Sequence, residues 1–237
     1  MKHRSWIAVN AVSAWFGVLL SLTLNLSGYY VDKGDPSEPT LLGNVPGGVD
    51  TPLERFFDWT TYFTILSNVV VVVAVTALLV RPDLFTRGGL TGTVWRTLRL
   101  DSVLMIVITG VLYNLLLADW NKTGWDLLSN LMLHVITPIV TVVVWVVAGP
   151  RGLVQPRLAV TALVIPLGWA AYALVRGAAI GAYPYPFLDV QTKGLASVLV
   201  FVAGVAVLGL ALGLLAVWVD RLLDRGRRTE DVTTPSA

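Results

Sequence analysis

Six long apolar stretches constrain this chain more than any other feature of its sequence. They cover residues 6–26, 59–80, 100–118, 127–148, 158–175 and 194–219, and none of them contains Lys, Arg or Glu. A helix of about 20 mostly apolar residues crosses a bilayer. The sequence therefore predicts an all-α integral membrane bundle of six transmembrane helices.

The overall composition agrees with a membrane protein and excludes several classes. Hydrophobic residues make up 55% of the chain and charged residues only 14%, whereas soluble domains carry about a quarter charged residues. These values exclude a soluble globular enzyme, a disordered protein and a nucleic-acid binder. The chain has no Cys and only two His, His3 and His134, so we expect no metal site and no cofactor.

The basic residues predict the orientation of the bundle. Of the 17 Lys and Arg residues, 12 lie in the termini and connections on one side and 5 on the other. Cytoplasmic loops carry the excess of positive charge, so both termini should be cytoplasmic. Arg outnumbers Lys, and Ala, Val and Gly are abundant. This usage is typical of a GC-rich bacterial genome, and we expect the protein in the cytoplasmic membrane.

The chain divides into a transmembrane domain at residues 1–220 and a charged cytoplasmic tail at 221–237, which we predict to be disordered. Residues 28–58 form the one long outer connection, rich in Gly, Pro and acids, and could close over the bundle as a lid. The first stretch resembles a signal peptide, but it is too long and no cleavage site follows it.

Polar residues inside the apolar stretches recur at helical spacing. Thr60, Thr64 and Ser67 or Asn68 fall on one face of the second stretch. Asn130, His134, Thr137 and Thr141 fall on one face of the fourth, and Thr109, Tyr113 and Asn114 lie near the outer end of the third. Polar groups at membrane depth are costly and point toward the bundle interior.

Three of these groups share one depth. With a rise of about 1.5 Å per residue, Thr64 lies about 8 Å, His134 about 10 Å and Asn114 about 6 Å inside the outer boundary. A hydroxyl, an imidazole and a carboxamide could therefore meet in one small cavity. In addition, Pro138 cannot donate to the carbonyl of His134, which predicts a kink and a free acceptor at the histidine.

Each of these residues also has a structural interpretation. Thr, Ser and Asn in membrane helices commonly bond to backbone carbonyls or across helices, and a lone buried His can be purely structural. Gly209 and Gly213 form a GxxxG pair for helix packing. Asp101 reads as an interfacial charge at a helix N-terminus. The outer segment with Tyr183, Tyr185 and Asp189 is either a lid over a cavity or an interface anchor.

Three segments in this order resemble the androgen-induced-gene-one family of multi-pass membrane proteins, in its bacterial branch. They are residues 63–68 (FTILSN), 130–138 (NLMLHVITP) and 185–189 (YPFLD). Animal members of that family are threonine hydrolases that cleave fatty acid esters of hydroxy fatty acids. The resemblance implies that Thr64 is a nucleophile and His134 its base. The residues that follow the threonine differ from those of the animal members, so the motifs support the fold more strongly than the substrate.

The chemistry of these residues is compatible with that implied role. A neutral imidazole can take the proton of a Thr hydroxyl, which is a poor nucleophile by itself. Asn68, Asn114 or Asn130 could stabilise the oxyanion, Thr60 could line the cavity, and Asp189 could approach His134 from the outer loop. The expected function is hydrolysis of a lipid ester in the outer leaflet, with membrane lipids as the other partners. The alternatives are a non-catalytic lipid-binding or transport protein that uses the same polar cavity, and a scaffold without a cavity.

Overall fold

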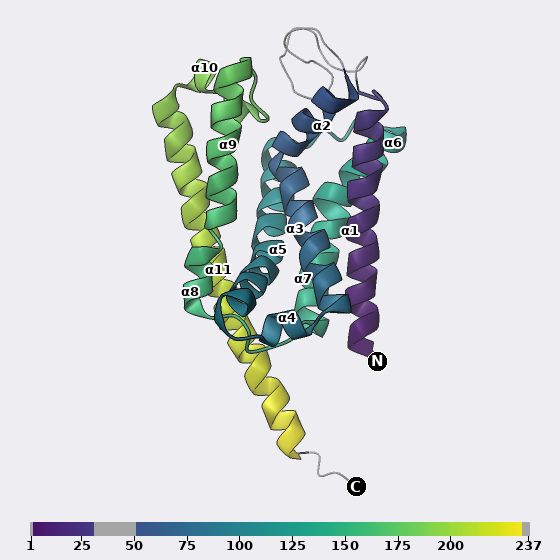
Figure 1. The fold of residues 1–237 in the computed structure, drawn as a ribbon, viewed down its shortest axis with the longest axis vertical. Helices are drawn as coiled ribbons and strands as arrows, with labels where there is room; N and C mark the ends of the chain where they lie inside the picture. Colours follow the sequence, from purple (N-terminus) through teal and green to yellow (C-terminus); the bar gives the residue numbers. More distant parts are fainter. Residues whose placement is uncertain (1, 31–50, 234–237) are drawn as a thin grey trace.

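The computed structural model describes residues 2–30 and 51–233, and this part of the chain is helical without any strand (Figure 1). Six segments are long and apolar enough to cross a membrane: His3–Leu26, Phe63–Val80, Gly89–Leu116, Gly124–Ala148, Pro156–Ile180 and Leu195–Gly226. The predicted all-α bundle of six membrane helices is confirmed. The chain is a multi-pass membrane protein.

Several of the spans are built from more than one element. The elements in chain order are α1 (Lys2–Leu26), α2 (Pro52–Thr61), α3 (Phe63–Val80), α4 (Asp83–Thr86), α5 (Gly89–Leu116), α6 (Gly124–Leu131), the π-helix η1 (Met132–Ile136), α7 (Thr137–Ala148), α8 (Pro156–Thr161), α9 (Val164–Ile180), the 3-10 turn η2 (Pro186–Leu188), α10 (Val190–Lys193) and α11 (Leu195–Thr233). Consequently, α6, η1 and α7 together form the fourth span, and α8 and α9 form the fifth.

Helices α1, α3, α5 and α7 form the packed part of the bundle, and α9 and α11 form a hairpin at its side (Figure 1). Ala14 of α1, Val71 of α3, Ile106 of α5 and Leu133 of η1 belong to one buried apolar cluster. The most apolar windows of α3 and α5 are each 61% buried, whereas those of the fifth and sixth spans are 28% and 17% buried. The hairpin is therefore the most lipid-exposed part of the molecule.

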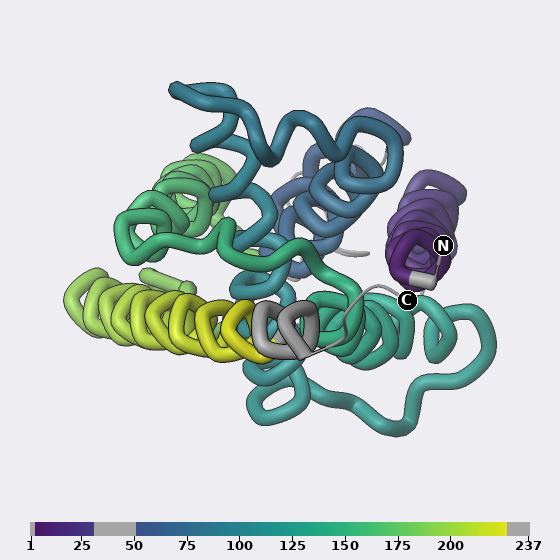
Figure 2. The backbone as a smooth tube through the Cα atoms, turned by 90° about the horizontal axis from the view of Figure 1, so that it is seen from below, coloured from purple at the N-terminus to yellow at the C-terminus, as the bar shows by residue number. Residues whose placement is uncertain are grey.

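The hairpin contacts the bundle mainly at one end, through α8. A Cβ atom on Gly213 of α11 would lie only 2.9 Å from Cβ of Ala159 in α8, so this glycine permits close helix packing, as predicted for the GxxxG pair. The start of α1 and the C-terminal part of α11 lie at this same end of the molecule (Figure 1). Seen from that end, α11 is strongly inclined to α1 (Figure 2).

The second span begins later than the sequence predicts, because the helix is interrupted at Tyr62. Helix α2 starts with a capping box, in which Thr51 and Glu54 bond reciprocally, and Pro52 follows at the first helical position. The backbone of Tyr62 is extended, with φ −78° and ψ 131°, so α2 ends at Thr61 and α3 starts afresh. The predicted outer loop therefore ends in a helix, and its residues 31–50 lie outside the described residues.

Two tertiary contacts fix α2 on the bundle. The indole N–H of Trp59 donates to the Ser21 hydroxyl of α1 at 3.0 Å, in a buried position. Asp58 and Arg176 form an ion pair between α2 and α9. Because α2 leads directly into α3, these contacts also set where the first turn of α3 lies.

The third and sixth spans also differ in their bounds from the sequence prediction. Helix α5 starts at Gly89, well before Asp101, so the prediction that Asp101 lies at a helix N-terminus is wrong. Its side chain is completely buried, and neither carboxylate oxygen has a hydrogen-bond partner among the described residues. Helix α11 continues through the first part of the predicted tail as far as Thr233.

The connection from α9 to α11 carries the aromatic segment predicted as a lid or an anchor. Gly181 ends α9 in the left-handed conformation, with φ 74°. Tyr183 then folds back onto α9, where its ring covers Gly177, and it is 8% exposed. This contact fixes the position of Tyr185, which follows two residues later.

We expect Gly177→Ala to disturb this connection. The new Cβ would lie 2.3 Å from Cδ1 of Tyr183, and overpacking of this kind costs about 1–3 kcal/mol. Thermal unfolding of the detergent-purified protein should show a lower Tm. Gly168→Ala on the same helix is the matched control, because no atom lies within 4 Å of its added Cβ. Equal Tm values for the two variants would contradict the tight contact.

Candidate functional site

The interruption at Tyr62 places Thr64 in the first turn of α3. The backbone N–H groups of Ile65 and Leu66 both donate to the Tyr62 carbonyl, at 3.1 and 3.2 Å. The N–H of Thr64 has no such acceptor in its own helix, and it donates to the hydroxyl of Tyr185 at 3.2 Å. In the first turn of α3, the hydroxyl and the backbone N–H of Thr64 therefore both face the Tyr185 hydroxyl.

The structure brings Thr64 and His134 together. Oγ1 of Thr64 lies 3.1 Å from Nε2 of His134, and Nδ1 of the same ring lies 3.1 Å from the Asn130 carbonyl oxygen. A carbonyl can only accept a hydrogen bond, so Nδ1 carries the hydrogen and Nε2 presents its lone pair to the threonine. This is the tautomer that a general base requires.

The fourth span is distorted at the histidine, as Pro138 predicts. Residues Met132–Ile136 form a π-helix around His134. The freed carbonyl of His134 does not stay without a partner, because the side chain of Asn114 in α5 donates to it at 3.1 Å. Single π-turns of this kind are frequent at functional sites. Here the turn holds the imidazole toward α3.

Tyr113 and Asn130 fix the plane of the imidazole. The ring of Tyr113 stacks on His134 with centroids 3.5 Å apart and an interplanar angle of 18°. The backbone carbonyl of Asn130 receives Nδ1–H of the histidine at 3.1 Å. Asn130 thus orients the base through its backbone carbonyl.

Tyr185 reaches the same point from the connection between α9 and α11. Its hydroxyl lies 3.3 Å from Oγ1 of Thr64, in addition to the contact with the Thr64 N–H. Its ring stacks on Phe187, with centroids 5.0 Å apart, and meets Tyr62 edge-on at 5.6 Å. Burial raises the pKa of Tyr185 above its ordinary value. The phenol therefore keeps its proton at neutral pH and can act as a donor.

Two of the three asparagines predicted as oxyanion donors, Asn68 and Asn114, are already engaged with the backbone. The amide of Asn68 donates to the carbonyls of Thr64 and Leu133, at 2.8 and 3.2 Å. The amide of Asn114 donates to the carbonyls of Gly110 and His134, at 2.7 and 3.1 Å. An amide group has two N–H donors, so neither side chain retains one for an oxyanion in this arrangement.

Three other predicted residues lie away from the Thr64–His134 contact. Thr60 belongs to α2, not to the helix of Thr64, and its hydroxyl donates to the Phe57 carbonyl at 2.8 Å. The carboxylate of Asp189 caps α10 by accepting from the backbone of Gln191 and Thr192, so it does not approach His134. Tyr183 packs on Gly177 and holds the connection without reaching the site.

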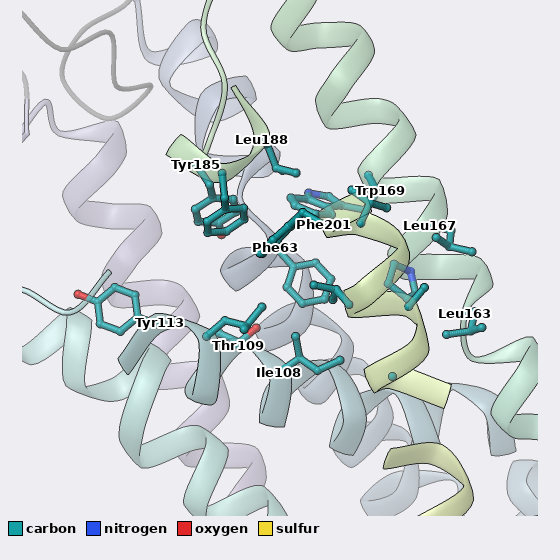
Figure 3. Close-up of a pocket in the computed structure, with 18 of the residues that line it drawn as sticks. Phe63, Ile108, Thr109, Tyr113, Leu163, Leu167, Trp169, Tyr185, Leu188 and Phe201 are labelled. Atoms are coloured by element: carbon teal, nitrogen blue, oxygen red, sulfur yellow. The ribbon is translucent and has the colours of Figure 1, made fainter. Parts of the chain in front are cut away.

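An apolar cavity lies beside Tyr185 and Tyr113, the rings that contact Thr64 and His134 (Figure 3). Its volume is about 90 Å³, and it is open on one side. Tyr185, Tyr113 and Phe63 form its wall next to Thr64 and His134. The remaining walls are aliphatic and aromatic side chains of α5, α9 and α11, and the cavity extends as far as Ile108, Leu163 and Gly209.

The sequence indicated that Thr64 and His134 share a depth, but it could not show that their helices touch. It missed the stacking of Tyr113 on His134 and the contact of Tyr185 with Thr64. Tyr185 lies 121 residues from Thr64, and a pairing at such a separation leaves no trace in helical periodicity. Within the described ranges, no group of three or more His, Cys, Asp or Glu side chains could hold a metal ion.

Replacement of Asn114 should destabilise the distorted span. Asn114→Ala removes the side-chain donor to the carbonyl of His134, which Pro138 cannot serve, at a cost of about 1–3 kcal/mol for an unpaired buried polar group. We expect a lower Tm in detergent for Asn114→Ala. Asn121→Ala, at an exposed position between α5 and α6, is the control. Identical unfolding of both variants would show that Asn114 does not support the π-turn.

Comparison of the chain with family models, with curated proteins and with solved structures gives no match.

Proposed function

We propose that this protein is an intramembrane hydrolase that cleaves the fatty acyl ester of a lipid, with Thr64 as nucleophile and His134 as general base. One observation carries the proposal: Oγ1 of Thr64 lies 3.1 Å from Nε2 of His134. The rings that contact these two residues, Tyr185 and Tyr113, line an apolar cavity. A hydroxyl and a correctly oriented imidazole within hydrogen-bond distance form the arrangement that activates a nucleophile.

The reaction follows from this geometry in two steps. Nε2 of His134 takes the proton of Thr64 while Oγ1 attacks the ester carbonyl carbon, and the same proton then passes to the leaving alkoxide as the acyl–oxygen bond breaks. Water attacks the resulting acyl-threonine with His134 again as base. The proton returns to Oγ1 as the fatty acid leaves, which restores the site.

The cavity fits the acyl chain of such a substrate. Its few polar groups, the hydroxyls of Thr109, Tyr113 and Tyr185 and the indole of Trp169, are outnumbered by aliphatic and aromatic walls. An alkyl chain therefore gains from transfer into it, whereas a charged group loses its hydration. The poorly buried hairpin of α9 and α11 forms one side of the cavity, and we infer that lipid reaches the site sideways past this hairpin, from the outer leaflet of the cytoplasmic membrane.

The three segments of the family resemblance converge on this site, which supports distant membership of the androgen-induced-gene-one family. Residues 63–68 supply Thr64 and Asn68, residues 130–138 supply His134, and residues 185–189 supply Tyr185. Their side chains meet although 61 residues separate the first segment from the second and 46 separate the second from the third. The proposed membership implies the fatty acyl ester as substrate class.

One observation favours the rival function, transport. Asp101 is a completely buried carboxylate inside a membrane span, and such residues commonly mark ion or substrate paths. Asp101 does not line the cavity, however, and the inner ends of α8 and α11 pack closely at Ala159 and Gly213. A structural scaffold should have no cavity, so the presence of this cavity also argues against that alternative.

The proposal predicts loss of ester hydrolysis when either reacting residue is removed. Thr64→Ala should reduce turnover of a fluorogenic acyl ester by purified protein to background. His134→Gln should lower kcat by roughly 10²- to 10⁴-fold, the usual contribution of a general base. Thr60→Ala and His3→Gln are the matched controls and should keep wild-type activity. Activity that survives Thr64→Ala, or a wild type without turnover of any acyl ester, would falsify the proposal.

The cavity predicts a dependence on acyl chain length. Gly209 lines the cavity on α11, and its added Cβ would meet only ordinary contacts, at 3.4 Å from Leu163. Gly209→Leu should therefore fill the cavity and lower kcat/KM for a long-chain ester by roughly 10- to 200-fold, with little change for an acetyl ester. Gly204→Leu, on the same helix at a position with open space around it, is the control. Equal losses for both chain lengths would place the acyl chain elsewhere.

A further inference from the structure

We propose that the hydroxyl of Tyr185 and the backbone N–H of Thr64 form the oxyanion hole of this site, an inference that rests on the proposed function. Attack by Oγ1 of Thr64 places the substrate carbonyl oxygen beside these two groups. The Tyr185 hydroxyl lies 3.3 Å from Oγ1 and 3.2 Å from the Thr64 nitrogen. Both donors are therefore within reach of the position where the negative charge develops.

The direction of every hydrogen bond around Thr64 is fixed. Nδ1–H of His134 donates to the Asn130 carbonyl, so Nε2 is an acceptor and receives the hydroxyl hydrogen of Thr64. Oγ1 then has no hydrogen left for Tyr185, and consequently Tyr185 donates to Oγ1. The Thr64 N–H in turn donates to the phenol oxygen. The phenol hydrogen thus already points at the reacting atom.

The other groups near Thr64 leave few alternatives as oxyanion donors. The amides of Asn68 and Asn114 donate both hydrogens to backbone carbonyls. The N–H groups of Ile65 and Leu66 donate to the Tyr62 carbonyl. In the first turn of α3, the N–H of Thr64 is directed instead at the Tyr185 hydroxyl. The Tyr185 hydroxyl and the Thr64 N–H therefore lie at the same position beside Oγ1 of Thr64.

Without substrate, the Tyr185 hydroxyl occupies the position that the carbonyl oxygen would take on the Thr64 N–H. When the ester binds, its carbonyl oxygen replaces the phenol oxygen on this N–H, and the phenol retreats by about 2.7 Å, one O–H···O distance, to donate to the carbonyl oxygen. Tyr185 also lines the apolar cavity, so the space for this retreat and the acyl chain lie on the same side.

The test compares Tyr185→Phe with wild type in full-length, detergent-purified protein and a fluorogenic acyl ester. The substitution keeps the ring that packs on Phe187 and Tyr62 and removes only the hydroxyl. We expect kcat to fall by roughly 10²- to 10³-fold, the usual loss for one oxyanion donor, with little change in KM. Tyr172→Phe is the control, because its hydroxyl lies 3.5 Å from Thr61 and does not reach Thr64.

A second readout separates an oxyanion role from a structural one. An acyl trifluoromethyl ketone forms a tetrahedral adduct with a nucleophilic hydroxyl, and its inhibition constant should rise in Tyr185→Phe by the same factor by which kcat/KM falls. A Tyr185→Phe protein with wild-type kcat, or with raised KM alone, overturns the oxyanion role and leaves the Thr64–His134 proposal intact. A wild type without ester turnover overturns both.

Discussion

The site depends on one constraint of the bilayer: backbone N–H and C=O groups at membrane depth must find partners inside the protein. Two interruptions, the extended residue Tyr62 and the π-turn before Pro138, release backbone groups from their helices. The polar side chains of the site satisfy these groups. Tyr185 accepts from the N–H of Thr64, and Asn114 donates to the carbonyl of His134. Trp169 in turn donates to the carbonyl of Thr61 at 2.9 Å.

This constraint explains why structural and chemical roles coincide in the same residues. The side chain that pairs with a freed carbonyl or N–H is held at a defined depth and angle, and the neighbouring reactive atom is held with it. Asn68 joins the first turn of α3 to the π-turn, since its amide donates to the carbonyls of both Thr64 and Leu133. The same hydrogen bonds can therefore stabilise helix packing and hold the reactive atoms in place, so the structural and the catalytic interpretation are compatible.

The sequence predicts the parts of the fold that follow from local chemistry. Hydropathy gives the six spans, and Pro138 gives the distortion at His134 because the missing N–H is a property of the residue itself. The interruption at Tyr62 has no such signal, since neither Gly nor Pro lies at residues 61–63. It is stabilised by Trp169 and Tyr185, 108 and 121 residues away. Helical periodicity consequently predicts Thr60 on the helix of Thr64, whereas the structure places it on α2.

The errors at Asp101 and at two predicted oxyanion donors, Asn68 and Asn114, have the same origin. Hydropathy marks where a bilayer begins, not where a helix begins. Arg96 and Arg99 therefore interrupt the apolar pattern within α5, and hydropathy alone places Asp101 at the start of the helix. The asparagines share the depth of Thr64, but depth does not reveal which N–H groups are already used. Both questions depend on tertiary contacts, which one sequence does not contain.

Among the described residues, no acid pairs with the base, which suits a site where a buried charge is costly. In the part of the chain described, the hydrogen-bond partner of Nδ1 of His134 is a backbone carbonyl, not a carboxylate. In serine triads, replacement of the acid by its amide lowers kcat by about 10⁴-fold, largely because the imidazole takes the wrong tautomer. A carbonyl cannot donate, so it enforces the correct tautomer without adding a charge at membrane depth. What it cannot supply is charge stabilisation of the imidazolium, and this places more of the catalytic demand on the donors that face the oxyanion.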